Sequence, residues 1–540
     1  MLPRLKPPPL ELPPSAAALA AIAFAFVLPG LAGHDPWKTH DVVGIGVAYG
    51  MLTSGDGLVP RVAGMPWLFD PPLFHWLAVA CGRLLSSLME FHAGARLASG
   101  LLVLAAFGLI YLAARAWQAD AHKREAAAAA LLILLGSLGL MVHAHEVLPE
   151  LAALAALCGA LATLPHAQRR PLGAGALFGA ALGLAFLSAS WIAPFALGLA
   201  VVAAHVACHE WRNRNGLLFL LCALVVTASV AGAWPLALYL RAPDLFAQWW
   251  LLASRPHGGF GLNLRYFLVT AGWFAWPAWP LAAWALWSLR RRLGEPRLFV
   301  PFAASAAMLA AIGFWGPRQD VNLLMLLPPL ALLAAQGALV LRRGAAGALD
   351  YFGVLGFGFF AFLVWLGYFA MLTGLPPRLA NNFFKTAPGF ALEFRLLPFL
   401  FALALLAGWL YVVFFSNRSP VRSVARWAAG IVLLWGSFAM LWMPWADYQK
   451  SYRGVALQLK SRIPAGADCI SGSGFGLPQR AALSYHAGIR TLAPTQKCAY
   501  FLTQGQPKHE LDAPAGRWTK LADVGRPGDK SERYRLYARK

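Results

Sequence analysis

Ionisable side chains are rare in this chain, and two short stretches contain several each. The first is HDPWKTHD at residues 34–41, and the second is HAHEVLPE at residues 143–150. Carboxylates beside imidazoles can accept a proton from a hydroxyl group, which is the chemistry of a general base. In a helix, residues four apart share a face, so Glu146 and Glu150 could line one cavity. The candidate acid–base residues are Asp35, His40, Asp41, Glu146 and Glu150.

Basic residues in neighbouring loops could bind a phosphate group, because guanidinium and ammonium groups form charge-assisted hydrogen bonds with its oxygens. The candidates are Arg61, Arg255, Arg318, Arg378 and Lys385. The acids are too scattered to define a metal site, so no metal ligand is assigned. No cofactor is predicted with certainty, and a divalent cation is the one cofactor that the sequence still allows. The acid–base and phosphate-binding residues can act on one substrate only if the surrounding elements bring their loops to the same face of the molecule.

The elements that position these residues are predicted membrane helices. The chain is 59% hydrophobic and 13% charged, with a mean hydropathy of +0.58, whereas soluble globular proteins carry about 25% charged residues. Apolar windows of about 20 residues recur along the chain, each long enough to cross a bilayer. The sequence therefore predicts an all-α polytopic membrane protein with about 13 transmembrane helices.

Basic clusters between the predicted spans indicate the orientation. Arg4 and Lys6 precede the first apolar run, and every later basic cluster between spans falls on the same side, as the positive-inside rule expects of the cytoplasm. This bias explains the net charge of +22 without a nucleic-acid partner. The predicted location is the bacterial inner membrane, with the candidate residues facing the periplasm.

Composition divides the chain into two predicted domains. Residues 1–446 form the transmembrane domain, in which 34–92 are a long first periplasmic loop with juxtamembrane helices. Residues 447–540 contain many charged residues and no span, and one helix with several short strands predicts a small periplasmic α/β domain. Cys469 and Cys498 lie in it, and they could form a disulfide in an oxidising compartment or remain free thiols.

The segment MLTSGDGLVPRVAGMPWLFDPPLFHWL, residues 51–77, resembles a signature of bacterial polytopic glycosyltransferases. These are GT-C class enzymes of the aminoarabinose-transferase and protein-mannosyltransferase type, whose first loop reads M-L-x-S-G-D-W-x-V-P and then K-P-P-L-x-x-W. Trp37 keeps the register of their preceding W-x-x-D-E motif. Two more segments are similar to family motifs, GLAFL at 183–187 and RQDVNLLMLLP at 318–328.

The resemblance implies a GT-C-like fold and transfer of a sugar from a polyprenyl-phosphate donor to a periplasmic lipid or glycan acceptor. In that family an acid in the first loop is the proposed base, and basic residues hold the donor phosphate. Glu150 best matches a second family acid. This chain departs from the motifs at positions where the family places functional groups. The residues there are His40 and Asp41 in place of D-E, Asp70 in place of the lysine before P-P-L, Ala189 in place of the lysine of T-K, and Asn322 in place of a tyrosine.

Three interpretations follow from these departures. The chain is an active transferase with a rearranged site, or a transporter or flippase for a lipid-linked glycan, or a catalytically divergent member with a structural role. A transporter predicts ionisable residues near the bilayer midplane, and the centres of the predicted spans are nearly free of charge. The transferase interpretation is therefore favoured. Its expected partners are a polyprenyl-phosphate-linked sugar, a lipid or glycan acceptor, and membrane lipids.

Overall fold

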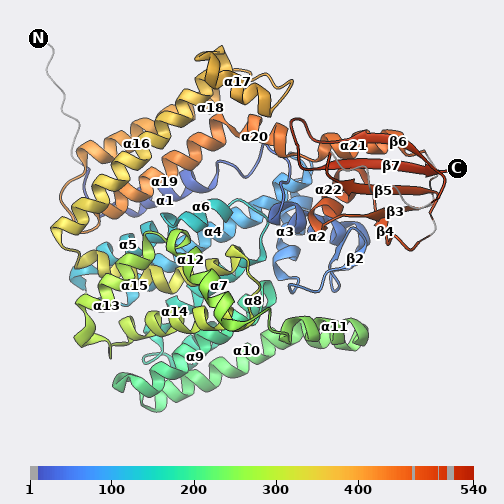
Figure 1. The fold of residues 1–540 in the computed structure, drawn as a ribbon. Coiled ribbons are helices and arrows are strands. Elements are labelled where there is room, and N and C mark those ends of the chain that lie inside the picture. Colours follow the sequence, from blue (N-terminus) through green and yellow to red (C-terminus); the bar gives the residue numbers. More distant parts are fainter. Residues whose placement is uncertain (1–9, 119, 465–466, 468, 497, 508–515) are drawn as a thin grey trace, which may run out of the picture.

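The chain, in a computed structural model, folds into a bundle of helices with a small β-sheet domain beside one end of it (Figure 1). This arrangement confirms the expected helical membrane protein with a C-terminal α/β domain. Arg4 and Lys6, on which the predicted orientation partly depends, lie outside the described residues. The structure describes residues 10–118, 120–464, 467, 469–496, 498–507 and 516–540.

Eight helical segments in the described chain are long and apolar enough to cross a membrane. They are α4 (Phe91–Ala116), α8 (Pro171–Ser188), α10 (Arg214–Arg241), α14 (Pro296–Trp315), the pair η5 (Asp320–Leu326) and α15 (Leu327–Leu339), α16 (Arg343–Thr373), α18 (Leu396–Phe415) and α19 (Arg422–Leu441). Three shorter helices are also apolar, namely α1 (Ala16–Val27), α3 (Leu73–Leu84) and α9 (Ile192–Ala207).

Several other apolar stretches of the roughly 13 expected spans fold as shorter helices. One example is the pair α12 (Phe260–Phe274) and α13 (Ala278–Ser288), between which Pro277 lacks an amide proton to continue the helix. The other short helices of the bundle are α5 (Lys123–Leu135), α6 (Leu138–His143) and α7 (Pro149–Thr163). Single 3₁₀ turns are η1 (Asp120–His122), η2 (Leu164–His166), η3 (His209–Trp211) and η4 (Arg290–Arg292).

Helices α8 and α10 pack with their backbones unusually close because of three glycines spaced four residues apart on α8. A Cβ atom at Gly175 or Gly179 would lie 2.6 or 2.4 Å from a backbone carbonyl oxygen of α10. A Cβ atom at Gly183 would lie 2.6 Å from Val230. Small residues at this spacing let membrane helices approach and gain van der Waals contact. The packing fixes the end of α8, from which the chain enters the site described below.

The segment between α1 and α4, residues 28–90, forms a compact layer, the first-loop layer, rather than an open loop. It contains α2 (His40–Ser54), a two-stranded hairpin of β1 (Arg61–Val62) and β2 (Met65–Pro66), and α3. Helix α2 ends where Gly55 adopts a left-handed conformation, with a φ of +69°, which glycine accommodates without strain. Two further short helices lie outside the bundle, α11 (Pro243–Ser254) and α17 (Pro377–Thr386).

The C-terminal domain contains a five-stranded mixed sheet and two helices, and a third helix, α20 (Met443–Lys450), connects it to the bundle. The strand order is β4-β3-β5-β7-β6, in which β3 is parallel to both neighbours and β7 is antiparallel to both of its neighbours. The strands are β3 (Ile470–Ser473), β4 (Thr491–Leu492), β5 (Tyr500–Gly505), β6 (Trp518–Val524) and β7 (Arg533–Arg539). The two helices of the domain are α21 (Arg453–Arg462) and α22 (Leu477–Ala487).

The C-terminal domain and the first-loop layer share one hydrophobic core. Val42 and Val47 of α2 are buried in the same cluster as Tyr452, Leu459 and Leu483. Burial of apolar surface across this boundary holds the domain against the layer, next to α2 and α3 (Figure 1).

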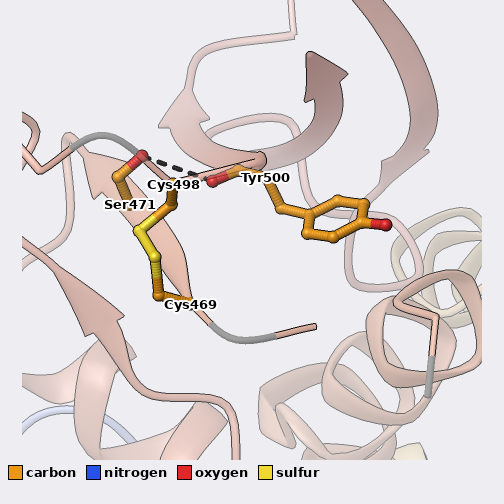
Figure 2. The surroundings of a disulfide bond; sticks show 4 residues. All are labelled: Cys469, Ser471, Cys498 and Tyr500. Carbon is orange, nitrogen blue, oxygen red and sulfur yellow. Dashed lines mark hydrogen bonds between the residues drawn. A yellow bond between two sulfur atoms is a disulfide. The ribbon is translucent and has the colours of Figure 1, made fainter. Parts of the chain in front are cut away.

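Cys469 and Cys498 form a disulfide that closes the start of β3 onto the segment before β5 (Figure 2). The hydroxyl of Ser471 donates a hydrogen bond to the Tyr500 carbonyl at 3.3 Å in the same region (Figure 2). Both links join β3 to the region of β5, and the loop that follows β3 leads into α22.

Candidate active site

A cavity of about 570 Å³ lies where the first-loop layer, the bundle and the C-terminal domain meet. Its walls come from α2, the segment before α3, α7, the α8–α9 junction, α11, η5 and the start of α22. Aromatic side chains form much of the lining, namely Trp67, Phe69, Phe186, Trp191, Trp249 and Trp315. Its ionisable lining residues in the described chain are His40, Asp70, His75, Glu150 and His257.

Asp70 and Glu150 are the two acids of this cavity. Asp70 stands just before Pro71 and Pro72, which lead into α3, and Glu150 lies in the first turn of α7. Trp67 Nε1 donates a hydrogen bond to Asp70 Oδ2 at 3.3 Å. Burial raises the pKa of both carboxyl groups, and the negative charge of Glu150 adds to this for Asp70, whose pKa lies well above its usual value. The pair therefore favours one neutral and one ionised carboxyl group, because like charges in a shared site resist joint ionisation.

Glu150 has an unused hydrogen-bonding group in the cavity. Its Oε2 atom is buried and accepts no hydrogen bond from the described residues. Buried polar atoms in proteins are nearly always paired, so an unpaired carboxylate oxygen in a cavity is suited to a partner supplied by a ligand. A hydroxyl group of a bound substrate is one such partner.

His75 is a cavity residue that the sequence reasoning missed. It is 1% exposed, lines the cavity, and neither of its ring nitrogens has a hydrogen-bond partner among the described residues. The available signal was a single histidine in the otherwise apolar run LFHWL, because ionisable residues in apolar helices are functional candidates.

Histidines and acids also form a group beside the cavity. The ring of His40, the first residue of α2, lies 6.0 Å from the ring of His143 in an edge-on arrangement. His143 pairs with Glu146 at 2.7 Å through Nδ1 and with Asp320 at 3.5 Å through Nε2. His40 and Glu150 therefore reach the cavity, whereas Glu146 is directed to His143 and does not line it.

Asp41 lies outside the cavity lining, although His40 precedes it directly. Its side chain is buried against Arg96 of α4, with 2.6 Å between Oδ2 and Nη2. The Val147 amide donates to Asp41 Oδ1 at 2.9 Å. Burial alone would raise the pKa of Asp41, but the charge and hydrogen bonds of Arg96 lower it overall. Successive residues of a helix point about 100° apart, which separates the directions of His40 and Asp41.

Asp35 is engaged by the C-terminal domain instead of the cavity. Arg453 Nη2 lies 2.5 Å from Asp35 Oδ1 and also 2.5 Å from Glu90 Oε2. Burial would raise the pKa of Asp35, but hydrogen bonds from Arg453 and Ser451 lower it. Asp35 thus links the first loop to α21.

Asp35, Glu90 and His92 could each offer one ligand atom to a metal ion, and these atoms lie within 4.8 Å of one another. Arg453 already bonds to both carboxylates, and Tyr485 pairs with His92 Nδ1 at 3.0 Å. A cation could bind only by displacing the guanidinium group, so these residues fit an ion-pair network better than a resident metal.

The basic candidates lie around the cavity or away from it. Arg255 and Arg318 are exposed, and each is flanked in sequence by cavity-lining residues. Arg61 of β1 donates a 3.4 Å hydrogen bond to the Gly64 carbonyl. Arg378 and Lys385 are exposed on α17, which lies on the opposite side of the bundle from α11 (Figure 1). Within the described residues, the cavity lining contains no lysine or arginine.

A second hollow of about 560 Å³ adjoins the cavity and is almost wholly apolar. It shares five lining residues with the cavity, namely Phe186, Trp191, Trp249, Ala253 and Trp315. Its other walls come from Ala228, Ala231, Gly232 and Pro235 of α10 and from Phe246, Trp250 and Ser254 of α11. The size and polarity suit a hydrocarbon chain whose polar end reaches the cavity.

Of the positions where the sequence departs from the family motifs, all but Asp41 lie at the cavity. His40, Asp70, Ala189 and Asn322 all line it. The residue types at these cavity positions differ from those of the motifs that the sequence resembles.

Comparison with known proteins identifies the fold. No family model matches the sequence, and no curated protein sequence matches it. Two solved structures of ArnT from Cupriavidus metallidurans are similar, each with 18% identity over 96% of this chain and 97% of the other. The TM-score is 0.69 for the structure bound to undecaprenyl phosphate and 0.70 for the apo structure. The expected GT-C-like fold is thereby confirmed over nearly the whole chain. An oligosaccharyltransferase from Archaeoglobus fulgidus aligns with 13% identity, over 89% of this chain and 64% of the other, at a TM-score of 0.48.

Proposed function

We propose that this chain is a membrane glycosyltransferase that moves a sugar from a polyprenyl-phosphate donor to a lipid or glycan acceptor on the periplasmic side of the bacterial inner membrane. The observation that carries the proposal is the pairing of Asp70 and Glu150 in a cavity that adjoins an apolar, aromatic hollow. A polyprenyl tail fits the hollow, and a sugar phosphate fits the cavity. The shared fold with a protein solved with undecaprenyl phosphate supports the binding of a polyprenyl phosphate.

In the proposed reaction Glu150 acts as the general base. Its unpaired carboxylate oxygen accepts the proton of the acceptor hydroxyl as that oxygen attacks the anomeric carbon of the donor sugar. The bond between the anomeric carbon and the phosphate oxygen breaks, and the polyprenyl phosphate departs with the electron pair. Phosphate is already a good leaving group, so the site needs mainly to activate the acceptor and stabilise the charge that develops on the phosphate.

Asp70 supplies part of that stabilisation in its neutral form. A raised pKa keeps a proton on the carboxyl group, which can then donate a hydrogen bond to a phosphate oxygen. This role explains how an acid can occupy the place of a family lysine. Arg255 and Arg318, each within two residues of cavity-lining positions, are proposed to compensate for the missing lysine by attracting the anionic donor.

The test is a transfer assay with the purified full-length chain in lipid vesicles. Polyprenyl phosphates carrying different radiolabelled sugars are supplied with membrane lipids and glycans as acceptors, and phosphate-free polyprenyl glycosides serve as a control. Transfer that requires the phosphate supports the proposal. Movement of labelled lipid between leaflets without any transfer identifies a flippase instead, and the absence of both supports a structural role.

A further inference from the structure

Glu532 of the C-terminal domain is a buried carboxylate at a junction of several segments. It lies directly before β7 and is 6% exposed. Lys38 Nζ donates to its Oε1 atom at 2.7 Å, and Gln479 Nε2 donates to the same atom at 3.1 Å. The hydroxyls of Tyr452 and Tyr534 donate to Oε2 at 2.8 and 3.1 Å. Four donors from four segments therefore converge on one side chain.

Two of those donors stand next to the walls of the cavity. Lys38 directly precedes Thr39 and His40, which line the cavity. Gln479, which is buried, directly follows Leu477 and Pro478, which line the cavity from the start of α22. The two wall segments are more than 400 residues apart in sequence; α2 and α22 pack directly in the shared core, and this carboxylate adds a polar link between their starts. Through Lys38 and Gln479, its position bears on how the two wall segments lie relative to each other.

We infer that Glu532 is a positioning residue that holds the Lys38–His40 wall and the Leu477–Gln479 wall of the cavity in register, so that the C-terminal domain completes the site for the lipid-linked donor. The inference deepens the proposed function and depends on it for the identity of the ligand. Buried, fully paired polar networks fix a single arrangement of the groups they join, because each unmade bond leaves a desolvated polar atom.

An ion pair that only stabilised the C-terminal domain would join residues within that domain. Asp523 provides this comparison, since it pairs with Arg533 at 3.1 Å and Arg535 at 3.4 Å between neighbouring strands. Neither of those arginines adjoins the cavity. Glu532 pairs with Arg526 within the domain at 3.7 Å, but it also bonds across the boundary to Lys38 of the first loop. Asp523→Asn is therefore the matched control for Glu532→Gln.

The experiment measures hydrogen exchange by mass spectrometry in the full chain held in lipid nanodiscs. Glu532→Gln is expected to lose protection in peptides covering both wall segments, around residues 36–44 and 475–482, whereas Asp523→Asn keeps it. Lys38→Met, at a half-exposed side chain, breaks the same link without altering the buried carboxylate, and Lys38→Arg is expected to retain protection. Unchanged exchange in both segments of Glu532→Gln and Lys38→Met, or equal loss in Asp523→Asn, would overturn the inference.

Transfer kinetics provide the second readout. Glu532→Gln is expected to lower kcat/KM for the donor by about 10- to 100-fold, as expected for misplaced substrate contacts, with Lys38→Arg close to wild type. A kcat/KM no lower than that of Asp523→Asn would contradict the positioning role. If the wild-type chain transfers no sugar, the proposed function fails, while the exchange data still decide whether Glu532 links the two walls.

Discussion

Replacement of Asp41 by asparagine separates a structural role from the catalytic role that the sequence suggests. In the fold, the Asp41 carboxylate accepts hydrogen bonds from Arg96 at 2.6, 3.2 and 3.3 Å and from the Val147 amide at 2.9 Å. Arg96 is fully buried, and its remaining bonds go to the carbonyls of His34 and Asp35. The asparagine keeps one acceptor oxygen and loses the negative charge that balances the guanidinium.

The expected cost is large because one partner of a buried ion pair is removed. Breaking such a pair typically destabilises a protein by about 3–5 kcal/mol, since an uncompensated charge stays buried. Removal of both partners, as in Asp41→Leu with Arg96→Met, should recover part of this loss. Recovery is incomplete because the two backbone carbonyls that Arg96 now satisfies lose their donor.

The assay combines thermal unfolding in detergent with turnover per folded molecule. Asp41→Asn should lower the unfolding midpoint strongly, while turnover per folded molecule stays within about tenfold of wild type, far from the 10²–10⁴-fold loss of a general base. Glu393→Gln, at an exposed loop position, is the control for a neutralised acid. A normal unfolding midpoint, with turnover reduced as far as expected for loss of a general base, would refute the structural role and identify Asp41 as the catalytic base.

Three further outcomes follow from the structure. The raised pKa of Asp70 makes its ionisation costly to the folded state as pH rises above the ordinary carboxyl range. Asp70→Asn should therefore raise the unfolding midpoint at pH 7, with the gain vanishing below about pH 4, and a gain that persists in acid would contradict this pKa. Ionisation of Asp70 at high pH should also reduce transfer by the wild-type chain, and the same variant should remove that loss. Replacement of Cys469 and Cys498 by alanine should cost about 3–4 kcal/mol of stability, from the entropy of a loop with a sequence separation of 29. Equal unfolding midpoints of the wild-type chain in oxidising and reducing buffer would exclude that contribution. Ala231→Phe, which fills the apolar hollow, should raise KM for long-chain polyprenyl donors more than for short-chain ones, whereas an equal effect on both would place the tail elsewhere.

The fold was largely accessible from the sequence because its main signal is local. Runs of apolar residues long enough for a bilayer, and a C-terminal region without them, determine the helical bundle and the attached α/β domain. Of the first-loop residues that the signature singles out, His40 and Asp70 line the cavity and Asp41 does not. Helix breaks within apolar stretches are less accessible, because a residue such as Pro277 separates one stretch into two short helices.

The individual roles of the acids depend on contacts that sequence patterns do not contain. Asp35 binds Arg453, which is 418 residues away, and no local pattern indicates that pairing. Asp41 and His40 are neighbours in sequence, but the helix directs Asp41 to Arg96 and leaves His40 at the cavity. By sequence, Asp70 replaces a phosphate-binding lysine, and only its proximity to Glu150 in the fold suggests a protonated hydrogen-bond donor. The catalytic and phosphate-binding assignments stay predictions.

The most direct test of the account is single-turnover transfer by Glu150→Gln from the polyprenyl-phosphate sugar that the wild-type chain uses. The amide matches the carboxylate in shape but cannot take a proton, so the account predicts donor binding close to wild type and a transfer rate lower by about 10²–10⁴-fold. Glu393→Gln, measured in parallel, should transfer at the wild-type rate. Transfer by Glu150→Gln at the wild-type rate would contradict the assignment of Glu150 as the base and, with it, the placement of the chemistry in this cavity.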